Sequence, residues 1–142
     1  MMPDAGDMVM LGVSVSGPAA ADVVWERYAR PDLWTSWSPQ IRRVEVAGRR
    51  LSGGETGRVF GPLGVSVDFT VDLWDEDART WSWTVRPHGS LLSGVRLARL
   101  RLLHTVEPDG TGCSTSLVAT GFAPLVATYL PVARLALHRL VR

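Results

Sequence analysis

The sequence contains no lysine and no asparagine, and it has a single cysteine, Cys113. One cysteine cannot form an internal disulfide, and one cysteine with three scattered histidines makes no zinc-binding pattern. A P-loop requires lysine, no GxGxxG fingerprint follows a predicted strand, and no GxSxG elbow is present. We therefore expect no metal and no cofactor, which argues against metal hydrolases, nucleotide-driven enzymes, Rossmann dehydrogenases and serine esterases. Cys113 is expected to be a small buried hydrophobe.

An excess of charge of one sign is also missing. Fifteen basic and 14 acidic residues give a formal net charge of +1, so no bulk field favours nucleic acid or stable insertion into an anionic membrane. The N-terminal segment lacks the charged, apolar, small-residue order of a signal peptide, and a cytoplasmic location is the simplest expectation. At 142 residues the chain is long enough to bury a core without disulfides, and we expect one domain over 1–142.

Alternation of apolar and polar residues predicts most of the chain to be strand. The clearest case places on one face Val65, Val67, Phe69, Val71 and Leu73. The expected strands lie at 8–15, 43–47, 57–60, 65–73, 81–85, 96–106 and 113–120. Glycine-rich and acidic turns separate them, which is typical of an antiparallel sheet of about seven strands.

Two short helices are predicted between the first two strands. The apolar side of the first is formed by Ala21, Val24, Trp25 and Tyr28. Pro31 ends this helix, and Asp32 can cap a second short helix that carries Trp34 and Trp37. Trp25 and Trp34 are interpreted as structural, and Trp37 with Ser38 as the rim of a cavity.

A longer helix is predicted at 122–141. Arg134, His138 and Arg139 interrupt its apolar run, which predicts a helix that covers a sheet and does not span a membrane. We expect Pro131 to kink or split it. Its inner stripe is expected to contain Phe122, Leu125, Tyr129, Ala133 and Ala136.

The order and spacing of these pieces resemble the START-like superfamily, also called SRPBCC or helix-grip, which includes polyketide cyclases and birch-pollen-allergen-type carriers. The pieces that carry the resemblance are VSVSGPAAADVVWERYARPDLWTSWSPQIRRVEV, GRRLSGGETGRV, VSVDFTVDLWDEDARTWSWTV, LLHTVEPDGTGCSTSLVATG and FAPLVATYLPVARLALHRLV. The resemblance implies an α+β helix-grip fold, in which a curved antiparallel sheet surrounds a long C-terminal helix. It also implies a ligand cavity between the two.

Three residues are candidates for catalysis. His104 alternates in phase with leucines, so it is expected to face the cavity as a general acid or base; the alternative is that it bonds a neighbouring group and packs. Tyr129 could donate its phenol proton to a ligand oxygen, or its ring could merely fill space. Arg58 lies on a strand of uncertain phase. An inward Arg58 would indicate an acidic or enolate-bearing ligand, and an outward one is the favoured alternative.

Trp81 and Trp83 share a strand face and could stack on a flat ligand, each with an indole N–H available as a donor. Trp83 is the preferred wall residue, and ordinary core packing is the alternative. The other expected ligand contacts are Phe69, Val71, Leu100, Leu102, Leu117, Phe122, Leu125 and Trp37. In the loop after the fifth strand, Leu91 and Leu92 could gate the cavity, although packing is favoured.

Together these features predict a protein that binds a small hydrophobic or polyketide-like ligand as a monomer or homodimer. The leading hypothesis is a polyketide cyclase/dehydrase-like enzyme that folds a reactive chain for intramolecular cyclisation or dehydration. The alternative is a non-catalytic carrier of a lipid, isoprenoid or pigment. A third hypothesis, a regulatory or partner-binding domain, predicts an occluded cavity and an exposed apolar patch.

Overall fold

The computed structural model describes residues 8–89 and 98–142. These residues form a seven-stranded antiparallel sheet of order β1-β7-β6-β5-β4-β3-β2. The strands are β1 (Met8–Gly17), β2 (Arg43–Val46), β3 (Thr56–Phe60), β4 (Ser66–Asp75), β5 (Thr80–Pro87), β6 (Leu100–Asp109) and β7 (Gly112–Phe122). The α-helices are α1 (Ala21–Ala29), α2 (Trp34–Trp37) and α3 (Ala123–Leu140), and 3-10 turns η2 and η3 cover Pro31–Leu33 and Pro62–Gly64.

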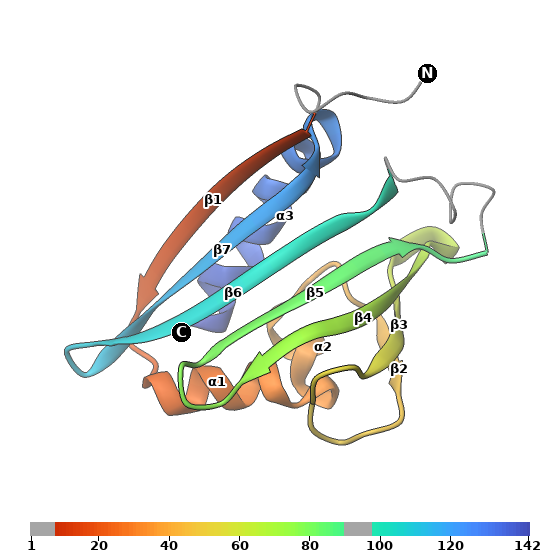
Figure 1. Cartoon of the computed structure of the whole chain (residues 1–142). Helices are drawn as coiled ribbons and strands as arrows, with labels where there is room; N and C mark the ends of the chain where they lie inside the picture. Colours follow the sequence, from red (N-terminus) through yellow and green to blue (C-terminus); the bar gives the residue numbers. More distant parts are fainter. Residues whose placement is uncertain (1–7, 90–97) are drawn as a thin grey trace.

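Figure 1 shows a curved sheet with α3 behind β7 and β6, while α1 and α2 close the opposite end below β4 and β5. The expected helix-grip fold is therefore confirmed. Leu91 and Leu92 lie outside the described residues, so the hypothesis of a gating loop stays a prediction.

The helix α3 begins where sequence chemistry places it, with Pro124 in its first turn, where a missing N–H is tolerated. Pro131 lies inside one continuous helix, so it does not split α3 as one form of the prediction held. The face that α3 turns toward the sheet contains the buried alanines Ala133 and Ala136. Because these side chains are short, the helix and the sheet leave space between them.

The two short helices follow the expected punctuation with one correction. α1 ends at Ala29, directly before Pro31. The Asp32 carboxylate does not cap α2, because it binds the Arg30 guanidinium at 3.1 Å and η2 intervenes.

The long alternation in β4 is interrupted by a bulge. The register with β5 shifts between Val71 and Leu73, because a bulge inserts an extra residue on one strand. Leu73 is therefore turned outward and is 45% exposed, although it was predicted to lie on the inner face. Its neighbour Trp74 instead packs on Trp25, with ring centroids 4.5 Å apart. Val65 precedes the strand and is 60% exposed.

One carboxylate ties the lower helices to the sheet. Glu76 accepts hydrogen bonds from Trp25 Nε1 at 2.7 Å, from Trp74 Nε1 at 2.9 Å and from Arg50. Burial raises the pKa of the Glu76 carboxyl, but these hydrogen bonds together outweigh burial and leave the pKa below its ordinary value. Trp25 and Trp34 are thus structural in placement, since Trp34 Nε1 donates to the Tyr28 carbonyl at 2.9 Å. Cys113 is fully buried.

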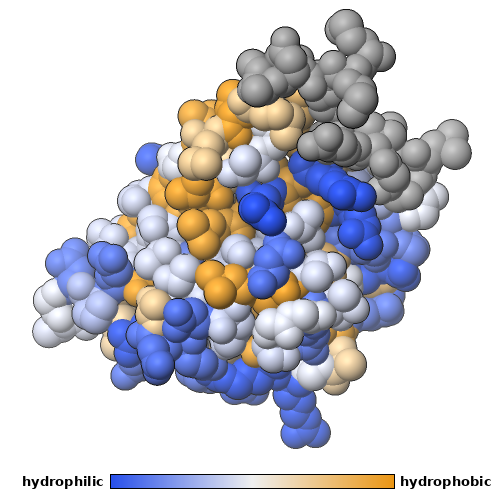
Figure 2. Space-filling view, in the orientation of Figure 1, coloured by the Kyte–Doolittle hydropathy of each residue, from blue (hydrophilic) through white to orange (hydrophobic). Residues whose placement is uncertain are grey.

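The outer face of the sheet mixes polar and apolar atoms (Figure 2). Apolar side chains are exposed near the start of β1, where Met10 is 70% and Leu11 is 44% exposed. Within residues 8–89 and 98–142, no helix has the length and apolar character needed to cross a membrane.

Candidate functional site

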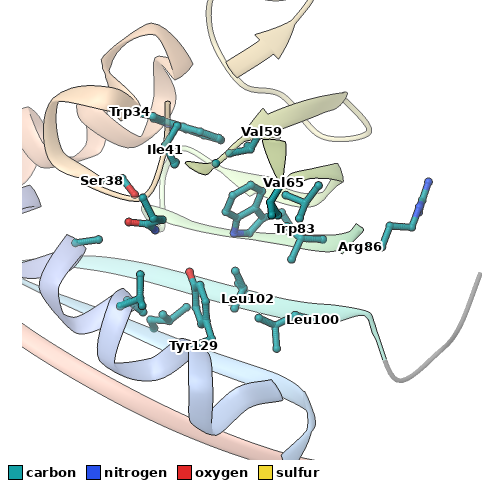
Figure 3. Close-up of a pocket in the computed structure, with 18 of the residues that line it drawn as sticks. Trp34, Ser38, Ile41, Val59, Val65, Trp83, Arg86, Leu100, Leu102 and Tyr129 are labelled. Atoms are coloured by element: carbon teal, nitrogen blue, oxygen red, sulfur yellow. The ribbon is translucent and has the colours of Figure 1, made fainter. Parts of the chain in front are cut away.

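A cavity of about 440 Å³ lies between the concave face of the sheet and α3. Figure 3 shows its walls: Trp83 and Val59 on one side, Leu100 and Leu102 on β6, and Tyr129 on α3. Side chains at one end of the wall are exposed, among them Val65 and Val132. The cavity is therefore open at this end and closed by aromatic rings at the other.

Most of the ligand contacts expected from the sequence lie in this wall. The wall residues that were predicted are Trp37, Trp81, Trp83, Leu100, Leu102, His104, Leu117, Leu125 and Tyr129. Phe69 and Val71 are buried beneath the wall and do not line it. Phe122 ends β7 opposite Met8 and also lies outside the wall. The alternation placed each residue on a face, but it carried no information on how far along that face the cavity extends.

His104 faces the cavity, and both of its ring nitrogens are engaged. An indole can only donate, so Trp83 Nε1 donates to His104 Nε2 at 3.0 Å. The neutral imidazole then carries its proton on Nδ1 and donates it to the Tyr28 hydroxyl at 3.1 Å. Tyr28 donates in turn to Thr115 Oγ1 at 3.2 Å, and Thr115 donates to the Thr105 carbonyl at 3.2 Å. Every group in this chain is satisfied without a charge.

Burial lowers the pKa of His104 to about 3. Protonation would also set an N–H on Nε2 against the N–H of Trp83, which opposes the same change. An imidazole that stays neutral with both nitrogens bonded is poorly placed to exchange protons with a ligand. The geometry favours the packing interpretation of His104, and its acid–base role stays a prediction.

Tyr129 projects from α3 into the cavity with its hydroxyl toward the sheet (Figure 3). Its ring is half-buried, and burial raises the pKa of its phenol to about 12. The hydroxyl is therefore a neutral hydrogen-bond donor at physiological pH. The buried Ser38 and the partly buried Gln40 add further polar groups to the wall.

Arg58 does not reach the cavity. Its Nε binds Asp68 Oδ1 at 2.9 Å, and the other oxygen of Asp68 lies 2.9 Å from His88 Nδ1. Burial raises the pKa of the Asp68 carboxyl, but the bonds from His88 and Arg58 outweigh it and the pKa is lowered. The catalytic assignment of Arg58 is thus corrected: it pairs across β3 and β4 away from the wall, as the outward alternative held.

Sequence reasoning missed Tyr28 as the partner of His104, and it missed Gln40 and Arg86 at the wall. Tyr28 and His104 are 76 residues apart, so no local pattern could pair them. Arg86 lines the cavity, but its guanidinium points away (Figure 3). In the part of the chain that the structure describes, no three His, Cys, Asp or Glu side chains are grouped to hold a metal ion.

A curved sheet gripping a helix around an apolar cavity defines the class of helix-grip proteins that bind hydrophobic ligands. The chain belongs to the family described as polyketide cyclase / dehydrase and lipid transport, which matches residues 8–142. Among 239 matching chains of solved structures is Ara h 8.0201. It has a TM-score of 0.69 and 13% sequence identity, over 91% of this chain and 95% of that one. A search of curated proteins found no match.

Proposed function

We propose that this protein encloses a small hydrophobic molecule in the cavity and holds it without acid–base chemistry, as a carrier. The observation that carries the proposal is a cavity of about 440 Å³ with a mainly apolar wall, open at one end. Pockets of this size bury most of the surface of a drug-sized molecule. Among the described wall residues, the one histidine is neutral and bonded at both nitrogens, which supports a carrier over a general acid or base.

Filling the cavity from α3 tests this proposal. Ala133 is buried in the wall, whereas Ala127 lies on the exposed side of the same helix. We expect Ala133→Phe to weaken binding of a hydrophobic fluorescent probe such as anilinonaphthalene sulfonate by about tenfold or more, because the added ring occupies the ligand's space. Titration of probe fluorescence measures the effect.

Ala127→Phe is the matched control and is expected to bind the probe like the unaltered protein, with circular dichroism confirming that both variants fold. Equal binding by the two variants would contradict ligand binding in this cavity. Mass spectrometry of molecules that co-purify with the unaltered protein would then identify the natural ligand class.

A cyclase/dehydrase-like enzyme is the second candidate, and Tyr129 is the observation that favours it. A neutral phenol in the wall can donate to a ligand carbonyl while the cavity holds a reactive chain in a folded pose. If the protein is such an enzyme, we expect Tyr129→Phe to lower kcat on a short poly-β-ketone thioester by about 100-fold.

The enzyme hypothesis also predicts that His104→Gln retains turnover, because His104 is bonded within the protein. A loss of turnover in His104→Gln that exceeds the loss in Tyr129→Phe would reverse this assignment of roles. The carrier proposal instead requires that the unaltered protein shows no turnover above the spontaneous rate.

A further inference from the structure

The six tryptophans differ in what their indole N–H groups bind. All six lie in the described part of the chain, and five donate to protein acceptors. The acceptors are Glu76 for Trp25 and Trp74, the Tyr28 carbonyl for Trp34, the Arg27 carbonyl for Trp37, and His104 for Trp83. Trp81 Nε1 is buried and finds no acceptor among the described residues.

Trp81 is held firmly in the cavity wall. Its side chain is 1% exposed, and its ring stacks on His104 with centroids 4.7 Å apart and an interplanar angle of 13°. Trp34 and Trp83 pack on it at centroid distances of 6.0 and 5.2 Å. A ring fixed on several sides cannot turn its N–H toward water without disrupting this packing.

The neighbouring histidine cannot relieve Trp81. His104 Nε2 already accepts from Trp83, and its Nδ1 donates to Tyr28. Trp83, two residues along the same strand, thus has its donor satisfied by the fold, whereas Trp81 does not. A buried donor without an acceptor is unfavourable by more than a typical hydrogen bond contributes, so such groups in native proteins call for an explanation.

We propose that the natural ligand carries a carbonyl oxygen on a flat ring system and that this oxygen accepts the N–H of Trp81. The inference rests on the proposed function, because it specifies the ligand of the same cavity. The indole rings of Trp34, Trp81 and Trp83 favour a flat partner. The amide oxygen of Gln40, a second wall residue, is also buried without a partner in the described residues, which favours a ligand that is not purely hydrocarbon.

Two ligands of the same shape test the inference. In 2-acetylnaphthalene the ring bears a ketone, and in 2-isopropenylnaphthalene a CH₂ group replaces the ketone oxygen. Dissociation constants are measured by isothermal titration calorimetry. We expect the ketone to bind about tenfold more tightly, since only the ketone pairs the buried donor.

Nuclear magnetic resonance of the ¹⁵N-labelled protein gives a measurement that does not depend on any variant. We expect the Trp81 indole proton to move downfield with the ketone and to stay near its unliganded position with the alkene. The other five indole protons should show no such difference between ligands, because their acceptors belong to the protein.

Trp81→Phe removes the donor and keeps a ring, so we expect both naphthalenes to bind it with a ratio of about one. Trp74→Phe is the matched control, because its N–H donates to Glu76 and its ring is not in the wall; its ratio should stay at about ten. Equal binding of the two ligands by the unaltered protein would overturn the inference while leaving the proposed function intact. Loss of the ratio in Tyr129→Phe with its retention in Trp81→Phe would also overturn it, in favour of the phenol. If neither naphthalene binds, the proposed function fails and this inference fails with it.

Discussion

Acidification from about pH 7 to about pH 5 is expected to lower the free energy of unfolding by about 2 kcal/mol through His104 alone. The side chain is 4% exposed, and burial lowers its pKa in the folded protein to about 3. In the unfolded chain the same imidazole has an ordinary pKa of about 6.5. The unfolded state therefore takes up a proton in this pH range that the folded state does not.

The sign of the effect follows from the direction of this pKa shift. A group whose pKa is lower in the folded state contributes its full stabilisation above the unfolded pKa, and that contribution is lost as the pH falls. For His104 the loss begins near pH 6.5 and continues toward pH 3, with a limiting slope of about 1.4 kcal/mol per pH unit. Asp68 and Glu76 have lowered pKa values, so their own contribution is lost mainly below this window.

His104→Gln separates this titration from every other one. The amide offers an acceptor to Trp83 and a donor to Tyr28 but binds no proton in this range. Urea unfolding at several pH values should give a stability curve for the variant that is flatter than that of the unaltered protein by about 2 kcal/mol over the window. His88 and His138 are present in both proteins and cancel. Parallel curves would mean that His104 is accessible to protons in the folded state.

The fold could be predicted because its signals are local. Alternation marked the strands from 65 onward, and proline positions marked where α1 ends and α3 begins. The bulge after Val71 was not predictable, since nothing in the alternating residues distinguishes a continuous strand from one with an extra residue. Leu73 and Trp74 exchange faces there because Trp74 gains a stack on Trp25 and a bond to Glu76.

The candidate site was only partly predictable because its decisive contacts join distant segments. His104 was found by its phase on β6, but its protonation state depends on Trp83 and Tyr28 from other elements. Trp81 and Trp83 look alike in the sequence, and only the packed structure shows that one indole N–H is satisfied and the other is not. Periodicity predicts the face of a side chain, whereas hydrogen-bond satisfaction depends on tertiary packing.

Replacing Gly112 by alanine is expected to destabilise the protein by about 3 kcal/mol, the largest effect we predict for a single methyl group. Gly112 is buried at the start of β7. A Cβ there would overlap the carbonyl oxygen of Gly17 and lie 3.1 Å from the Cα of Pro18. Backbone atoms cannot rotate away as a flexible side chain can, so β1 would have to separate from the β6–β7 turn. Gly17 is itself packed against Val141, which limits any retreat in that direction.

Gly53→Ala provides the matched control, because no atom lies within 4 Å of the added methyl group. We expect its stability to stay within about 0.5 kcal/mol of the unaltered protein, whereas Gly112→Ala should lower Tm by about 10 °C. Thermal unfolding followed by circular dichroism measures both. The close approach lies where β1 leads into α1, so a weakened contact would also loosen the closed end of the cavity beside Tyr28 and His104. Equal melting temperatures for the two variants would show that β1 and β7 are further apart here than the structure places them.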